Sequence, residues 1–144
     1  MHAYRIETVR VRENNFPYEE QSCFHNAQEV IAFARSLQDA DVEKFLILYL
    51  STKNKLIGIT VQMGSLNSAV VYPREVAKTA LLSCANAVIF VHNHPSDDLS
   101  PSPEDKNLTK TIKSALDLFG ISVHDHIILG EGEKYFSFAE NLIL

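Results

Sequence analysis

The sequence predicts an α/β (α+β) fold, a single domain in which a mixed β-sheet is flanked by about three helices. Two nearly continuous apolar runs, Lys44–Leu50 and Ala87–His92, have the length and composition of buried central strands. Helix-start patterns precede segments whose apolar residues recur at helical spacing. The 144 residues are 46% apolar and 22% charged, as in an ordinary globular protein, so we expect residues 1–144 to form one domain.

The first half of the chain should supply a strand, a helix and a hairpin. Tyr4–Arg12 alternates polar and apolar residues, which is typical of a half-exposed strand. Asn26, with Glu29 three residues later, has the pattern of a capping box at the start of a helix. The turn sequence TKNK joins the apolar run Lys44–Leu50 to Leu56–Met63, which predicts a β-hairpin.

The second half should supply two helices separated by strands. Ser68–Tyr72 is expected to be a short strand, and Pro73–Cys84 a helix with proline in its first turn. Ser102, followed by a proline and two acids, predicts the start of a helix that ends near Phe119. Residues 121–130 and 134–139 are expected to pair as strands around the turn sequence EGEK.

The composition argues against several classes of protein. The formal net charge of −5 does not support a nucleic-acid binder, because such a protein needs a basic face to displace counterions from phosphates. No apolar run approaches the roughly 20 residues of a membrane span, and the N-terminus has no signal-peptide pattern. Cys23 and Cys84 match no zinc or redox spacing and indicate reduced thiols in a cytoplasmic protein. The sequence leaves open whether the chain forms a homo-oligomer.

The stretch FVHNHPSDDLSPSPED, residues 90–105, carries the strongest functional signal. His92 and His94 are two residues apart at the end of a predicted strand, so both imidazoles should lie on one face. Asp105, in the first turn of the next helix, can fold back toward them. Two neutral imidazoles and one carboxylate are the ligand set of a catalytic zinc with an open position. Ser102 and Asp105 also form a capping-box pattern, which would fix the directions of both side chains.

The complete pattern H-x-H-x(7)-S-x-x-D resembles the signature of the JAMM (MPN+) metalloproteases. The segments YPREV, AVIFVHNHPS, PSPED and DHIILG are similar to the RadC family, bacterial proteins labelled as DNA repair proteins. The similarity runs from Glu43 to the C-terminus, so residues 43–144 are the core of the resemblance. Full-length RadC proteins usually carry an N-terminal module of the helix-hairpin-helix type, for which we expect no room in this chain.

The resemblance implies a JAMM domain with a cytidine-deaminase-like arrangement of sheet and flanking helices. It implies that His92, His94 and Asp105 bind Zn²⁺. The implied function is a zinc-dependent hydrolase of the metallopeptidase type, which cleaves a peptide or isopeptide bond by attack of a zinc-bound water. The partner would be a protein or peptide substrate.

The resemblance also implies two catalytic side chains besides the metal ligands. Glu43, immediately before a buried strand, matches the position of the glutamate that accepts the proton from the attacking water. Ser102 would stabilise the developing oxyanion. Glu75 is the alternative general base, although the dipole of its predicted helix already accounts for an acid at that position.

Other interpretations stay open. Some JAMM-fold domains are non-catalytic binding modules, and the family label also allows an accessory protein of DNA repair or of mobile elements. The second H-x-H pair, His124 and His126, could be another pair of metal ligands. The similarity to RadC sequences instead indicates that Asp125 and His126 support the structure or the site and that His124 is incidental. Asn93 and Ser96 are expected in a loop, where they could hydrogen-bond near the site, although turn chemistry alone accounts for both.

Overall fold

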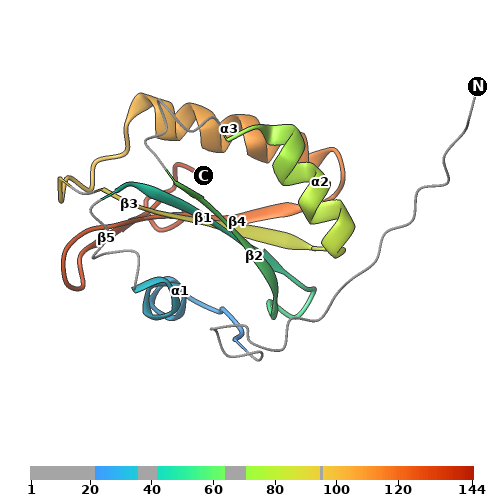
Figure 1. Cartoon of the computed structure of the whole chain (residues 1–144), viewed down its shortest axis with the longest axis horizontal. Coiled ribbons are helices and arrows are strands. Elements are labelled where there is room, and N and C mark those ends of the chain that lie inside the picture. The colour runs from blue at the N-terminus through green and yellow to red at the C-terminus, as the bar shows by residue number, and fades with distance from the viewer. Residues whose placement is uncertain (1–21, 36–41, 64–70, 95) are drawn as a thin grey trace, which may run out of the picture.

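Five strands form one mixed β-sheet with helices on both faces (Figure 1). The computed structural model describes residues 22–35, 42–63, 71–94 and 96–144. Within these residues, the five-stranded sheet and the three helices confirm the predicted α+β fold. The strand expected over residues 4–12, and most of the strand expected over residues 68–72, lie outside the described part of the chain.

The order of the strands puts β3 at the centre of the sheet. The strands are β1 (Lys44–Leu50), β2 (Leu56–Met63), β3 (Ala87–Asn93), β4 (Ser122–Leu129) and β5 (Tyr135–Ser137). Their spatial order is β2-β1-β3-β4-β5, and the only parallel pair among these described strands is β3 with β4. Parallel neighbours need a crossover connection rather than a tight turn. The long segment between β3 and β4 makes this crossover, and together with the end of β3 it carries the H-x-H-x(7)-S-x-x-D pattern.

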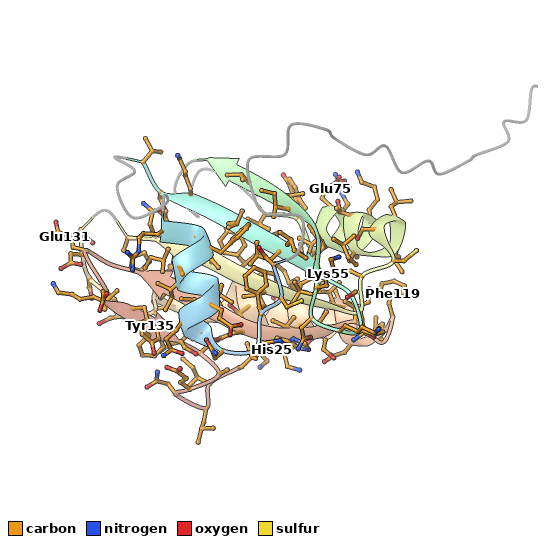
Figure 2. The ribbon with its side chains drawn as sticks, turned by 90° about the horizontal axis from the view of Figure 1, so that it is seen from below. His25, Lys55, Glu75, Phe119, Glu131 and Tyr135 are labelled. Carbon is orange, nitrogen blue, oxygen red and sulfur yellow. The ribbon has the colours of Figure 1, made fainter. Side chains whose placement is uncertain are left out.

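The helices cover the two faces of the sheet unequally. Helix α1 (Ala27–Ala34) lies on one face, whereas α2 (Pro73–Ser83) and α3 (Pro103–Asp117) lie on the other (Figure 1). Asn26 begins α1 as expected, because its side chain accepts a hydrogen bond from the backbone N–H of Glu29 at 2.9 Å. Figure 2 looks onto the face that α1 covers.

Two apolar clusters form the core, one on each face of the sheet. In β1, Leu46, Leu48 and Leu50 pack toward α1, and Phe45, Ile47 and Tyr49 pack toward α2 and α3. All six are at most 2% exposed, so β1 is buried on both faces as its continuous apolar sequence predicts. Burial of each such side chain contributes about 1.5–3 kcal/mol. This rigid sheet positions the ends of β1 and β3, where the polar residues of the motif begin.

A β-bulge in β4 changes which side chains face α3. Val88 of β3 pairs with Val123, but Ile89 pairs with Asp125, so His124 is the extra residue. Val123 packs in the cluster under α2 and α3, whereas Ile127, four residues later, packs in the cluster under α1. Because alternation in a strand has a period of two, one extra residue exchanges the faces. His126 therefore points toward α3.

The loop that follows β3 is attached to the turn between β4 and β5. The Asp97 carboxylate accepts a hydrogen bond from the backbone N–H of Glu131 at 2.7 Å and pairs with Lys134. Gly130 lies directly beneath this contact. A Cβ atom there would come within 2.6 Å of Asp97 Oδ1 and 2.8 Å of Leu99 Cδ2. The absence of a side chain at residue 130 thus allows the loop to pack against β4.

We expect Gly130→Ala to lower the free energy of unfolding by about 1 kcal/mol, because the methyl group would displace the Asp97 carboxylate from its hydrogen bond with the Glu131 N–H. Gly58→Ala is the matched control, since a Cβ at Gly58 meets nothing within 4 Å and should leave stability unchanged or raise it by about 0.5–1 kcal/mol. Urea unfolding followed by circular dichroism measures both. Equal stability of the two variants would contradict the proposed close packing at Gly130.

Candidate metal centre

The structure brings His92, His94 and Asp105 together at the C-terminal end of β3. His92 is the second-to-last residue of β3 and is completely buried, and His94 follows the strand with a side chain 15% exposed. The two Nε2 atoms are 2.8 Å apart. Asp105 lies in the first turn of α3, with Oδ1 3.4 Å from Nε2 of His92 and Oδ2 3.6 Å from Nε2 of His94. Three donor groups therefore converge on one point.

A capping box holds the Asp105 carboxylate in this position. The Ser102 hydroxyl accepts a hydrogen bond from the Asp105 backbone N–H at 3.0 Å, and the Ser102 backbone N–H donates to Asp105 Oδ2 at 2.8 Å. Pro103 occupies the first position of the helix, where its missing N–H costs nothing. The local sequence that starts α3 thus also directs one oxygen of Asp105 toward the histidines.

Glu43 joins the same cluster from the residue before β1. Ligand atoms of Glu43, His92 and His94 all lie within 4.8 Å of one another, so these three side chains could hold a metal ion. The negative charge of Glu43 adds to the effects, led by Asp105, that raise the pKa of His94. The structure therefore places Glu43 beside the two histidines, although it lies 49 positions before His92 in the sequence.

Asn93 holds the backbone on both sides of Glu43. Its side-chain carbonyl accepts from the Lys44 N–H at 2.8 Å, and its side-chain amide donates to the Val42 carbonyl at 3.3 Å. Asn93 is 1% exposed and belongs to β3, so the expected loop position and the explanation by turn chemistry are wrong, whereas the alternative of hydrogen bonds near the site agrees with the structure. The sequence did contain a signal for this role, because an amide in an apolar strand is expected to be buried, and a buried amide needs hydrogen-bond partners.

Glu75 is occupied elsewhere. It forms ion pairs with Lys78 and Arg74 on the exposed side of α2. Figure 2 shows Glu75 and Glu131 at opposite ends of the molecule, and the backbone of Glu131 is bonded to Asp97 in the loop that follows His94. The acid at the start of α2 is therefore explained by its helix and its cationic neighbours.

The protonation states of the cluster follow from burial and hydrogen bonding. Burial lowers the pKa of His92 to about 4, against the attraction of Asp105, so this ring is neutral at pH 7. The hydrogen bond with Asp105 raises the pKa of His94, against the effect of burial. Burial opposes the ionisation of Asp105, but His94, His92 and Ser102 together hold its pKa well below the usual range. The cluster therefore contains a carboxylate that attracts a positive charge.

The donor set fits a metal ion. Among the residues that the structure describes, Asp105 Oδ1 is the buried side-chain atom that lacks a hydrogen-bond partner. Nδ1 of His94 lies in hydrogen-bond contact with the Asp98 carbonyl, which can only accept, so Nδ1 carries the proton and Nε2 of the neutral ring has a lone pair. The lone pair of His94 Nε2 and the unpaired Asp105 Oδ1 would both be satisfied by a cation placed between them.

Asp125 and His126, which follow the bulge, have separate roles. Asp125 accepts hydrogen bonds from the Ser137 hydroxyl at 2.6 Å and from the backbone N–H groups of His126 and Ala139 at 2.7 and 3.0 Å. Asp125 therefore connects β4 to the last residue of β5 and to the segment that follows it. His126 Nε2 lies 2.7 Å from Nδ1 of His92. His124 is exposed, so the second H-x-H pattern does not direct two imidazoles to one point.

A cavity of about 340 Å³ lies on the other face of the sheet, under α1. Its lining includes Phe24, His25, Val30 and Asp125, but none of the residues of the metal cluster. The cavity and the cluster are therefore different features of the molecule, and the chemistry of the donor groups identifies the cluster as the candidate site.

The fold and the cluster define a small α+β domain with a candidate metal centre beside a carboxylate, the arrangement of the JAB, or JAMM-like, class. The chain belongs to the RadC-like JAB domain family, which it matches over residues 24–143. This confirms the resemblance drawn from the motif and extends it upstream of Glu43.

Several relatives named UPF0758 proteins are similar to this chain. One from Actinobacillus pleuropneumoniae serotype 5b is 41% identical over 139 residues, covering 95% of this chain and 59% of the relative. One from Trichlorobacter lovleyi is 46% identical over 119 residues, covering 82% of this chain and 51% of the relative. The chain thus spans about half the length of the curated relatives it matches. In the described part of the chain, no helix has the length and apolar content to cross a membrane.

In the metal-free protein, we expect the free energy of unfolding to fall as the pH rises from about 6.5 through the pKa of His94. Asp105 raises the pKa of His94 in the folded state, so protonated His94 stabilises the fold below its unfolded pKa and loses this contribution when it deprotonates. Asp105→Asn should flatten the dependence. Urea unfolding at a series of pH values, with a chelator present, measures it, and an unchanged slope in Asp105→Asn would assign the effect to another group.

Proposed function

We propose that this protein is a zinc-dependent hydrolase of the JAMM metallopeptidase type, which cleaves a peptide or isopeptide bond in a protein or peptide substrate. The observation that supports this proposal is the convergence of His92, His94 and Asp105 around an unsatisfied carboxylate oxygen, with Glu43 beside them. Two imidazoles, one ligand carboxylate and a further acid are the groups that metal-assisted hydrolysis requires.

His92, His94 and Asp105 would hold the ion. Zinc bound there would supply Lewis acidity, which makes water a stronger acid near neutral pH and polarises an amide carbonyl. With three protein groups as ligands, the site would leave room for water or substrate at the ion. The burial of His92 and the capping box at Asp105 restrict both side chains, which would limit the rearrangement that binding requires.

Glu43 would serve as the general base and then as the general acid. Its carboxylate would take a proton from the attacking water and return it to the leaving amine. Asn93 accepts a hydrogen bond from the Lys44 N–H and donates one to the Val42 carbonyl, and these two bonds hold Glu43 beside the start of β1. A positioned base of this kind contributes about 10²–10⁴-fold to the rate.

Ser102 would stabilise the developing oxyanion. The backbone N–H of Asp105 uses the hydroxyl oxygen of Ser102 as an acceptor, so the hydroxyl proton can be directed toward the substrate. The capping box thus orients a donor as well as a ligand. A single donor in an oxyanion hole contributes about 10²–10³-fold to kcat.

We expect the purified protein to bind one zinc ion per chain, and His92→Ala and His94→Ala to lose it. His124→Ala is the matched control, because His124 is exposed and belongs to the extra position of the bulge. Metal analysis of the dialysed proteins measures the occupancy, and circular dichroism checks that the variants fold. Equal zinc in the wild type and in both cluster variants would show that the metal lies elsewhere.

Glu43→Gln should reduce hydrolysis by about 10²-fold or more while zinc occupancy stays near that of the wild type, because glutamine keeps the shape but cannot accept the proton. Glu75→Gln is the control and should retain activity. A quenched fluorescent peptide library is the starting substrate, with chelator-sensitive cleavage as the criterion. A Glu43→Gln protein with wild-type activity on such a substrate would remove Glu43 from the mechanism. Zinc binding without any chelator-sensitive cleavage would instead favour a non-catalytic binding module.

A further inference from the structure

We infer that Thr109 and His126 form a buried hydrogen-bond relay that fixes the tautomer of His92 and directs its Nε2 lone pair into the metal cluster. Thr109 and His126 are in this view positioning residues, which act on the metal through His92. The inference deepens the proposed function and rests on it for the identity of the bound group. The relay itself is defined by the chain's own hydrogen bonds.

The relay consists of three short contacts among buried groups. The Thr109 hydroxyl donates to the Asp105 carbonyl at 2.7 Å. The same hydroxyl oxygen lies 2.6 Å from Nδ1 of His126, and Nε2 of His126 lies 2.7 Å from Nδ1 of His92. Thr109 is 2% exposed and both histidines are completely buried, so solvent does not compete for these contacts.

Only one arrangement of protons satisfies all three contacts with neutral rings. The Asp105 carbonyl can only accept, so the Thr109 proton points to it, since two oxygen atoms 2.7 Å apart with no proton between them repel each other. The Thr109 oxygen must then accept from His126, which places the His126 proton on Nδ1. The His126 ring is completely buried against Phe45, Phe90 and Phe138, which disfavours a charged imidazolium, so Nε2 of the neutral ring is an acceptor.

The same reasoning assigns the proton of His92. Because Nε2 of His126 accepts, Nδ1 of His92 must donate, and the neutral His92 ring then has its lone pair on Nε2. This is the atom that lies 2.8 Å from Nε2 of His94 and 3.4 Å from Asp105 Oδ1. A metal-binding imidazole needs such a deprotonated nitrogen, and a hydrogen bond to the other ring nitrogen sets its orientation.

Aromatic packing prevents the rings from turning out of the relay. The His126 ring stacks on Phe138 with centroids 4.5 Å apart, and it forms T-shaped pairs with Phe45 and Phe90 at centroid distances of 5.5 and 5.8 Å. The His92 ring stacks on Phe45 at 5.8 Å. Because these neighbours are themselves buried, the rings stay in the orientation that the hydrogen bonds require.

The relay also links the two elements that supply the ligands. It begins at the backbone of Asp105 in α3 and ends at His92 in β3, whose Nε2 faces the Asp105 side chain. His126 of β4 closes this path. A shift of α3 relative to the sheet would therefore disturb the His92 tautomer as well as the position of the Asp105 carboxylate.

Nitrogen-15 NMR of the metal-free wild type tests the tautomers directly. We expect His126 to carry its proton on Nδ1, and His92 to carry its proton on Nδ1 with an unprotonated Nε2. A His126 ring protonated on Nε2, or a His92 ring with its proton on Nε2, would overturn the inference. This measurement needs neither a variant nor a bound metal.

Thr109→Val and Thr109→Ser form the test of the effect on binding. Valine keeps the shape but removes the hydroxyl, so His126 is no longer held as the Nδ1 tautomer, and the affinity for Zn²⁺ should fall about 10–100-fold. Serine keeps the hydroxyl and should bind zinc as the wild type does. Thr111→Val is the control, because the Thr111 hydroxyl bonds a helix carbonyl in the same way but is exposed. Competition with a fluorescent chelator measures each affinity.

The outcomes separate the relay from the proposed function. A wild type that binds no zinc would contradict the proposed function, and the NMR measurement would still decide the relay. A wild type that binds zinc, with Thr109→Val binding equally well, would overturn the relay alone. If Thr109→Val does not fold, the tautomers of the wild type decide.

Discussion

The buried carboxylate of Asp105 is the constraint on which the rest of the site depends. One of its oxygens is held by the Ser102 backbone, and the other faces His92 without a hydrogen-bond partner. A buried carboxylate in this state is costly unless a positive charge is nearby. The start of α3, the end of β3 and the position of Glu43 are all arranged around this group. The unpaired carboxylate oxygen therefore lowers the stability of the metal-free fold, and the same oxygen provides a place for a cation.

The sheet holds these groups in place because its central strands are packed on both faces. Strands β1 and β3 are buried throughout most of their length, and their ends carry the polar residues of the site. Asn93 joins these two ends across the sheet, which is why an acid far away in the sequence can be held beside the histidines. The loop after β3 is anchored separately, through Asp97 and the surface of β4 at Gly130.

Much of the fold and part of the site could be predicted from local patterns. Continuous apolar runs identified β1 and β3, and the capping box of Ser102 and Asp105 placed the start of α3 correctly. The spacing of His92 and His94 predicted that their imidazoles would meet, and their Nε2 atoms do so. These features depend on residues that are near each other in the chain, and the relevant physical rules act over a few positions.

The sequence by itself determined most of the helices and strands of the described residues, the cap of α3 and the residue types that converge as candidate ligands. The tertiary structure decided which distant groups support them. The bulge at His124 turns His126 toward His92 and Thr109, and no alternation pattern along residues 121–130 predicts that change of face. The sequence signals that Asn93 needs hydrogen-bond partners, but it does not identify them, because Val42 and Lys44 lie about 50 positions away at the start of another strand. Register between strands is set by the packing of both faces of the sheet, which a single segment of sequence does not contain.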